Sequence, residues 1–204
     1  TIGGDGVGNK IFACSSNGIY IGYSDNNLVQ GNMIGSDGTH NWGNTGNGIS
    51  IWEGAGNVIY KNTIAYNSSA STYNGGIKIQ ESSAIHNKLS QNSIYDNGGF
   101  GISLSNGANA AISSPVITRN GYTVSGTTCT GCTVEIFSDA QDQGRYYEGS
   151  TVADGTGNFS WSGHVQENFI TATVTDSSMN TSMFSLPVKA YFPWPMFLPA
   201  TTKH

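Results

Sequence analysis

An internal repeat of about 30 residues constrains the fold of this chain more than any other feature. Three short phrases recur in the same order along the first half of the sequence. Two of them begin with Asn and recur in steps of 30 residues, at Asn27, Asn57 and Asn87, and at Asn32, Asn62 and Asn92. The third begins with Gly-Ile and recurs in steps of 30, 28 and 25 residues, at Gly18, Gly48, Gly76 and Gly101. Because the three phrases repeat together, they predict a fold made of stacked repeats.

Each repeat contains short apolar runs rich in Ile and Val, separated by Gly, Asn, Ser and Asp. This pattern is typical of short strands and turns, and no repeat has room for an amphipathic helix of about ten residues. We therefore predict an all-β fold, a β-solenoid with about three strands per coil and coils about 4.8 Å apart. The repeats predict two interior ladders, one of Ile19, Ile49, Ile77 and Ile102 and one of Ile34, Ile64 and Ile94.

The repeated Asn residues have two interpretations. They can form a sugar-binding rail on the surface, or they can support the turns. In the second case each Asn adopts the left-handed conformation, and its side-chain amide bonds to the coils above and below. The sequence favours the structural interpretation, because the Asn residues recur at fixed turns.

With phrases of the form N-x-I and N-G-I-x-I, roughly residues 1–110 resemble the right-handed parallel β-helix repeat proteins of the bacterial secreted and surface type. The opening Thr1-Ile2-Gly3-Gly4 is similar to the family phrase N-T-I-G-G without its Asn. The resemblance implies a short right-handed parallel β-helix. It does not decide function, because the family includes polysaccharide lyases, glycosidases, epimerases, phage tailspikes, adhesins and surface proteins with no known reaction.

A second unit follows Gly107, where the Asn repeat stops. Short alternating strands at 146–152, 158–161 and 169–175 predict a small antiparallel β-sandwich. The segment Cys129–Asp139, CTGCTVEIFSD, resembles the start of immunoglobulin-like modules that close many surface β-helix proteins. The resemblance implies a cap on the last coil, whose edge is otherwise exposed. We place the β-helix at 1–112, the Ig-like sandwich at 113–188 and an extended tail at 189–204.

The pair Cys129 and Cys132 can be a redox motif, half of a zinc site or a local disulfide. A second pair and a βαβ pattern are both missing from the sequence, so we predict a disulfide. A disulfide is typical of an extracellular or cell-surface location. Cys14 is predicted to be a small, buried apolar residue.

Glu53 and Glu81 are the candidate catalytic residues if the protein is an enzyme. Each lies five residues after the Gly of a Gly-Ile phrase, which places them on neighbouring coils about 5 Å apart. Such a pair can serve a retaining glycosidase or bind Ca²⁺, with Trp52 stacking on a sugar. The alternative, two solvated side chains at one turn, is favoured, because the repeats contain no Arg and the His residues lack metal-ligand spacing. Apart from Ca²⁺ here, no cofactor or metal is expected.

The segment 35–46 is the longest insertion between repeats, and it carries Trp42 as a second candidate for ligand binding. Charged residues make up 10% of the chain, and the net charge is −5 with two Arg residues, which argues against nucleic acid as a partner. The sequence contains no run of about 18 apolar residues, so no membrane span is predicted.

The tail is rich in aromatic residues and Pro, which excludes a helix and leaves a segment too apolar to stay in water. It is expected to pack on its own domain or on a neighbouring subunit. Its candidate assembly residues are Tyr191, Phe192, Trp194, Phe197 and Leu198. The first hypothesis is therefore a secreted or cell-surface structural protein that self-associates head to tail, as a filament or surface layer. The alternative is a carbohydrate-active protein, a glycosidase-like enzyme or a polysaccharide-binding module, that uses the β-helix face.

Overall fold

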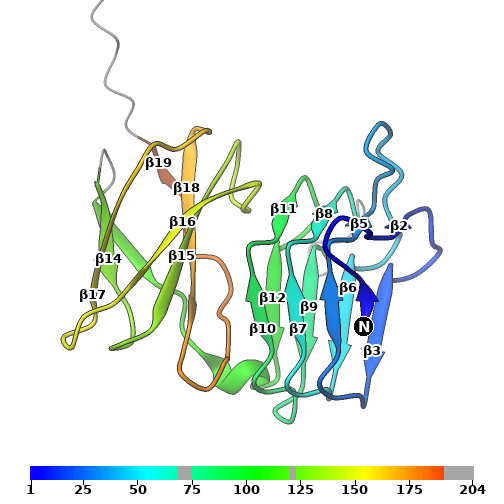
Figure 1. Ribbon diagram of the computed structural model, residues 1–204, viewed down its shortest axis with the longest axis horizontal. Coiled ribbons are helices and arrows are strands. Elements are labelled where there is room, and N and C mark those ends of the chain that lie inside the picture. Colours follow the sequence, from blue (N-terminus) through cyan, green and yellow to red (C-terminus); the bar gives the residue numbers. More distant parts are fainter. Residues whose placement is uncertain (69–74, 120–122, 191–204) are drawn as a thin grey trace, which may run out of the picture.

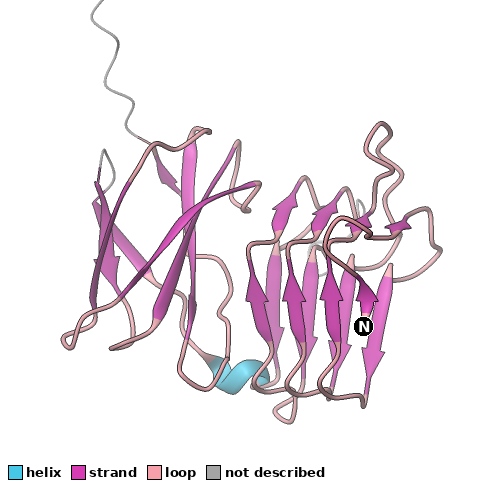
Figure 2. Ribbon diagram, in the orientation of Figure 1, coloured by secondary structure: helices cyan, strands magenta, loops and turns pink. Residues whose placement is uncertain are grey.

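The computed structural model describes residues 1–68, 75–119 and 123–190. Two β units lie side by side in it, and the chain passes from one to the other through a short 3-10 turn, η1 (Ala108–Ala111) (Figures 1 and 2). The assembly candidates Tyr191, Phe192, Trp194, Phe197 and Leu198 lie outside the described residues.

The first unit is a solenoid whose coils each give one short strand to each of three parallel sheets (Figure 1). Sheet A contains β1 (Ile2–Gly3), β4 (Leu28–Gln30), β7 (Val58–Tyr60) and β10 (Lys88–Ser90). Sheet B contains β2 (Lys10–Ile11), β5 (Met33–Ile34), β8 (Thr63–Ala65) and β11 (Ser93–Tyr95). Sheet C contains β3 (Ile19–Gly22), β6 (Ile49–Trp52), β9 (Ile77–Gln80) and β12 (Ile102–Ser105).

The interior ladders predicted from the repeats are confirmed. Parallel pairing brings the Gly-Ile phrases into register in sheet C, at Ile19, Ile49, Ile77 and Ile102. It does the same in sheet B for Ile34, Ile64 and Ile94. These side chains form one apolar core, and each fully buried Ile contributes about 2 kcal/mol. Strands of two to four residues are stable here because every coil buries its apolar side against the next.

The Asn residues stack between the coils, as the structural interpretation predicts. Oδ1 of Asn62 accepts hydrogen bonds from the backbone N–H and Nδ2 of Asn32, at 2.9 and 3.0 Å. Nδ2 of Asn62 donates to Oδ1 of Asn92 at 3.0 Å and to the carbonyl of Val29 at 2.9 Å. Equivalent ladders join Asn27, Asn57 and Asn87, and Asn44, Asn67 and Asn97. These buried amides therefore satisfy backbone groups at the turns and are not a surface rail.

The prediction that the ladder Asn adopts the left-handed conformation is wrong. The residue before it does so: φ is +51° at Lys61 and +52° at Gln91, which precede Asn62 and Asn92. The Asn side chain must point into the coil to reach the backbone of both neighbouring coils. The reversal of the chain therefore falls on the preceding residue.

The second unit is a sandwich of two antiparallel sheets. Sheet D contains β13 (Val116–Arg119), β14 (Thr123–Thr127) and β17 (Asn158–Ser162). Sheet E contains β16 (Tyr146–Val152), β15 (Thr133–Asp139), β18 (Phe169–Thr175) and β19 (Val188–Lys189). Buried residues of both sheets share one core, in which Val124 and Phe159 of sheet D meet Ile136 and Ile170 of sheet E. The strands predicted at 146–152, 158–161 and 169–175 are confirmed as β16, β17 and β18.

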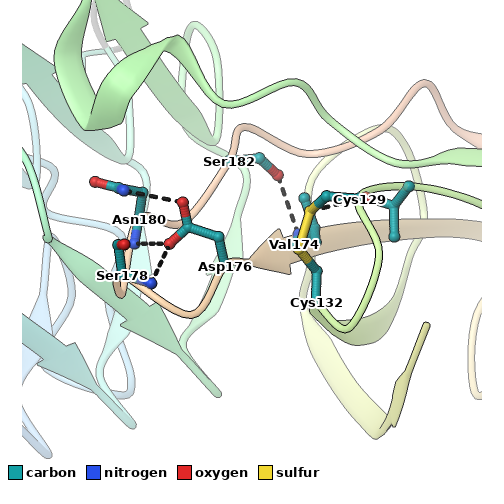
Figure 3. The surroundings of a disulfide bond; sticks show 8 residues. Cys129, Cys132, Val174, Asp176, Ser178, Asn180 and Ser182 are labelled. Atoms are coloured by element: carbon teal, nitrogen blue, oxygen red, sulfur yellow. Dashed lines mark hydrogen bonds between the residues drawn. A yellow bond between two sulfur atoms is a disulfide. The ribbon is translucent and has the colours of Figure 1, made fainter. Parts of the chain in front are cut away.

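The predicted disulfide between Cys129 and Cys132 is also confirmed, with an S–S distance of 2.04 Å. It closes the turn between β14 and β15, and Figure 3 shows it beside Val174 of β18. Cys14 is a free thiol and is half-buried.

The sandwich covers the last coil by supplying the hydrogen bonds of a further coil. Gln143 extends one Asn ladder, because its Oε1 accepts from Nδ2 of Asn97 at 3.1 Å. Asn109 of the connecting turn η1 extends another ladder, with its Oδ1 accepting from the backbone N–H of Asn87 at 3.0 Å. Gly144 pairs with Ile94 of β11 as an antiparallel bridge. The cap that the resemblance implied therefore continues the solenoid's own hydrogen-bonding pattern.

Candidate functional site

A groove of about 500 Å³ lies on the outer face of sheet B. Figure 1 shows β5, β8 and β11 of this sheet side by side along the solenoid. The loop after β5 forms one wall, and the start of β16 in the sandwich forms the other. The groove is lined by Met33, Ser36, Gly38, Thr39, Asn41, Thr63, Tyr66, Ser93, Tyr95, Arg145 and Tyr146.

The floor of the groove is a row of outward-facing residues that crosses from one coil to the next. Parallel pairing sets Met33, Thr63 and Ser93 in register, each directly before an interior Ile. The antiparallel bridge between Ile94 and Gly144 sets Arg145 opposite Ser93, so Arg145 continues the same row. The Ser93 hydroxyl donates to the carbonyl of Arg145 at 2.6 Å and fixes this junction. Neighbouring positions are about 4.8 Å apart, the spacing of paired strands.

Three tyrosines surround the end of the row nearest the sandwich. The rings of Tyr66 and Tyr95 meet edge to face, with centroids 5.7 Å apart. The guanidinium carbon of Arg145 lies 4.6 Å from the centroid of the Tyr95 ring and 5.3 Å from that of Tyr146. Burial, helped by Tyr66 and Asp96 and opposed by Arg145, raises the pKa of Tyr95. The Tyr95 phenol is therefore neutral at physiological pH and keeps its proton as a hydrogen-bond donor.

The loop that forms the far wall is held by its own hydrogen bonds. It leaves β5 at Gly35, where φ is +92° and an added Cβ would lie 1.9 Å from the carbonyl oxygen of Ala65. The Asp37 carboxylate accepts from the amides of Thr39 and His40, at 2.8 and 2.7 Å, and its Oδ2 lies 3.0 Å from Nδ1 of His40. These bonds, first the one to the His40 side chain, hold the pKa of Asp37 well below its usual range.

The chemistry of this lining suits binding. It offers hydroxyl groups, one amide, aromatic rings and one guanidinium, and its described residues include no carboxylate or imidazole. General acid–base hydrolysis of a glycoside uses a pair of carboxylates, which this groove does not supply. Neutral hydroxyls beside aromatic rings can form hydrogen bonds with a polyhydroxylated ligand and pack against its apolar faces.

Comparison with known families supports the reading of the fold. A family model described as the right-handed β-helix region matches residues 3–163, most of the chain. The chain belongs to the right-handed β-helix family. The match extends through the solenoid into β17 of the sandwich. No curated protein matches this β-helix protein.

Glu53 and Glu81 take equivalent turn positions on neighbouring coils of this β-helix, after β6 and β9. Both are in the left-handed region, with φ of +55° and +79°, as are Tyr23 and Asn106 on the flanking coils. The Glu81 carboxylate accepts a hydrogen bond of 2.7 Å from Nδ2 of Asn106. Because this column follows sheet C, the two Glu residues do not line the groove on sheet B. Both Glu residues therefore occupy a turn position, which Tyr23 and Asn106 fill on the flanking coils.

The two Trp candidates lie in different surroundings. Trp42 belongs to the loop of the groove wall and is 49% exposed, with its ring stacked on His40 at 4.9 Å and tilted against Phe12 at 5.3 Å. Trp52 is half-buried on the outer side of sheet C, and its indole Nε1 is buried with no hydrogen-bond partner in the described part of the chain. Trp42 lies next to the groove, and Trp52 is remote from it.

Sequence reasoning missed Tyr66, Tyr95 and Arg145. The outward positions were readable in principle, since Thr63 and Ser93 are the middle residues of the N-x-I phrases, and Tyr95 directly follows one of them. Arg145 lies outside the repeated N-x-I phrases, so no such pattern marked it. Its position depends on how the sandwich docks on β11, which no local pattern encodes.

Among residues 1–68, 75–119 and 123–190, no three His, Cys, Asp or Glu side chains gather as a metal site. Within the same ranges, no helix has the length and apolar character needed to cross a bilayer.

Proposed function

We propose that this protein is a non-catalytic polysaccharide-binding protein of an extracellular or cell-surface setting. The observation that carries the proposal is the groove on sheet B, where Thr63 and Ser93 place hydroxyls on neighbouring coils beside three tyrosine rings. This groove is the surface that we propose for the polysaccharide. The disulfide between Cys129 and Cys132 supports an oxidising location.

The groove fits a saccharide in both shape and chemistry. Pyranose rings have apolar faces that pack on aromatic rings, and hydroxyl edges that exchange hydrogen bonds with Ser, Thr, Tyr and Asn. The row from Thr63 through Ser93 to Arg145 runs along the stacking axis with a repeat of about 4.8 Å. A linear chain of sugars laid along this axis meets Met33, Thr63, Ser93 and Arg145 in turn. The sheet behind it is rigid, so little ordering is needed on binding.

Binding is tested by presenting the full chain to an array of linear polysaccharides and then measuring affinity for a retained oligosaccharide by calorimetry. Tyr95→Ala removes a ring from the groove and is expected to weaken binding about tenfold or more. Tyr60→Ala is the matched control, because Tyr60 lies on the outer side of sheet A in the neighbouring coil. Equal affinity for both variants, or retention of no polysaccharide by the unmodified chain, would rule out this function.

A second candidate, self-association, is favoured by the edges of the solenoid. In sheets A, B and C the terminal strands β1, β2 and β3 have a strand neighbour on one side only within the described chain. Tyr20 and Tyr23 beside this edge are 59% and 74% exposed. Unpaired strand edges are templates for a second chain. Because the sandwich covers the other end, addition of one solenoid to another would use the β1–β2–β3 edge.

This second function is tested by light scattering across a range of protein concentrations. Association is expected to be reduced by Tyr20→Lys, which places a charge beside the edge of β3. A particle mass that stays at 21.5 kDa at every concentration would contradict self-association.

A further inference from the structure

Arg145 is the one charged side chain among the described residues that line the groove. Within the described ranges, no ion pair of 4.0 Å or less joins Arg145 to an acid. The side chain is half-buried, so its charge is partly shielded from water. A guanidinium in such a position, without a carboxylate of its own protein, can receive an anionic group of a ligand.

The structure holds this guanidinium in place from two directions. The backbone of Arg145 is fixed by two hydrogen bonds between Ile94 and its neighbour Gly144, of 2.9 and 2.8 Å, and by the hydrogen bond from the Ser93 hydroxyl to the Arg145 carbonyl. Its side chain lies against the rings of Tyr95 and Tyr146. The two cation–π contacts confine the side chain, and a guanidinium carries five N–H donors in its plane. The donors are thus oriented before a ligand arrives, which lowers the entropy lost on binding.

We propose that Arg145 makes the groove selective for anionic sugars, by pairing with a carboxylate or sulfate group carried on the saccharide. The inference rests on the proposed polysaccharide binding and names the class of ligand for that site. The sugar ring that carries the anion lies at the Ser93 end of the row, where Tyr95 supplies a ring and the coil beyond supplies Thr63. The solenoid and the sandwich both contribute to recognition, so the cap is part of the site.

The net charge of the chain is −5, which opposes the binding of anionic sugars in general. A chain with an excess of acidic residues repels polyanions at long range. An anionic sugar is therefore retained by the local pairing at Arg145 and not by a general positive surface. This distinguishes the site from a basic patch, in which any cation contributes.

The experiment compares β-1,4-linked oligoglucuronate of four residues with its carboxyl-reduced, neutral form and with a sulfated form of that neutral oligomer. The full chain is titrated with each by calorimetry. Binding of one or both anionic forms is expected to be about ten- to hundredfold tighter than binding of the neutral form, as for charge-assisted hydrogen bonds. Arg145→Gln should remove this preference, so that the anionic and neutral forms bind with similar affinity. The two anionic forms show which group Arg145 prefers.

Lys61→Gln is the matched control, because it removes one positive charge away from the groove. Gln91 already occupies the equivalent turn position one coil later, with φ of +52°, so this variant should fold normally. Equal losses in the two variants would show a nonspecific charge effect and overturn the assignment to Arg145. Equal binding of neutral and anionic oligomers would overturn the selectivity while leaving polysaccharide binding intact. If no form binds and the polysaccharide array is also negative, both proposals fail.

Discussion

At the scale of single residues, the ladder Asn side chains make hydrogen bonds that an apolar side chain cannot replace. Asn62 is 1% exposed and bonds to both neighbouring coils. Asn62→Ala would take the acceptor from the backbone N–H of Asn32 and one donor from the carbonyl of Val29, and a buried group left unsatisfied costs about 1–3 kcal/mol. We predict a loss of roughly 3 kcal/mol in the free energy of unfolding, measured by urea denaturation.

Asn168→Ala is the control for this prediction, because Asn168 is exposed and makes its hydrogen bond through its carbonyl. Its free energy of unfolding should change by less than about 0.5 kcal/mol. A similar loss in both variants would show that the ladder bonds carry no special share of the stability.

At the scale of elements, the groove wall depends on how the loop leaves β5. Gly35→Ala forces a side chain into the left-handed region and against the carbonyl of Ala65. We expect the loop to shift and the groove to lose affinity for its saccharide by roughly tenfold. The measurement is calorimetric titration with far-UV circular dichroism beside it. Gly155→Ala is the control, since nothing lies within 4 Å of an added Cβ there; equal effects of the two changes would contradict the prediction.

The disulfide is a second feature at the scale of elements. It closes a loop of four residues at the β14–β15 turn, and a loop this short implies a stabilisation of about 2 kcal/mol or less. Adding a reductant should lower the midpoint of thermal unfolding of the unmodified chain by a few degrees. The same reductant should leave a Cys129→Ser/Cys132→Ser variant unchanged. A shift of equal size in this variant would point to another cause, and Cys14→Ser tests the free thiol.

The same elements explain how far the sequence could predict this protein. The sequence predicts one ladder of Ile19, Ile49 and Ile77 because parallel stacking repeats the same position once in every coil. The strands β16, β17 and β18 followed from local alternation. Arg145 lies in the groove because an isolated β-bridge pairs its neighbour Gly144 with Ile94, a residue 50 positions earlier in the chain. Contacts between the two units depend on how their surfaces dock. The repeat period of the solenoid and the apolar alternation of the sandwich strands each describe one unit alone.

At the scale of the whole molecule, one buried carboxylate joins the sandwich to the solenoid. Glu135 is 7% exposed, and its Oε1 and Oε2 accept from the Ser90 hydroxyl at 2.6 Å and the Gln91 amide at 3.0 Å. Burial raises the pKa of Glu135, although these two bonds and Lys88 oppose the shift. A raised pKa means that the folded state favours the protonated form. The stability linked to Glu135 is therefore complete below its unfolded pKa and is lost as the pH rises through its folded pKa.

Glu135→Gln tests this coupling, because Gln is neutral at every pH and can still accept from Gln91 and donate to Ser90. We expect the variant to be more stable than the unmodified chain at pH 7 and the difference to vanish toward pH 4, as measured by urea unfolding across this range. Glu167→Gln, a half-exposed acid of the same sandwich, should show no such pH-dependent gain. If Glu135→Gln instead lost stability at pH 7 and matched the unmodified chain at pH 4, the ionised carboxylate would be the form that the junction prefers.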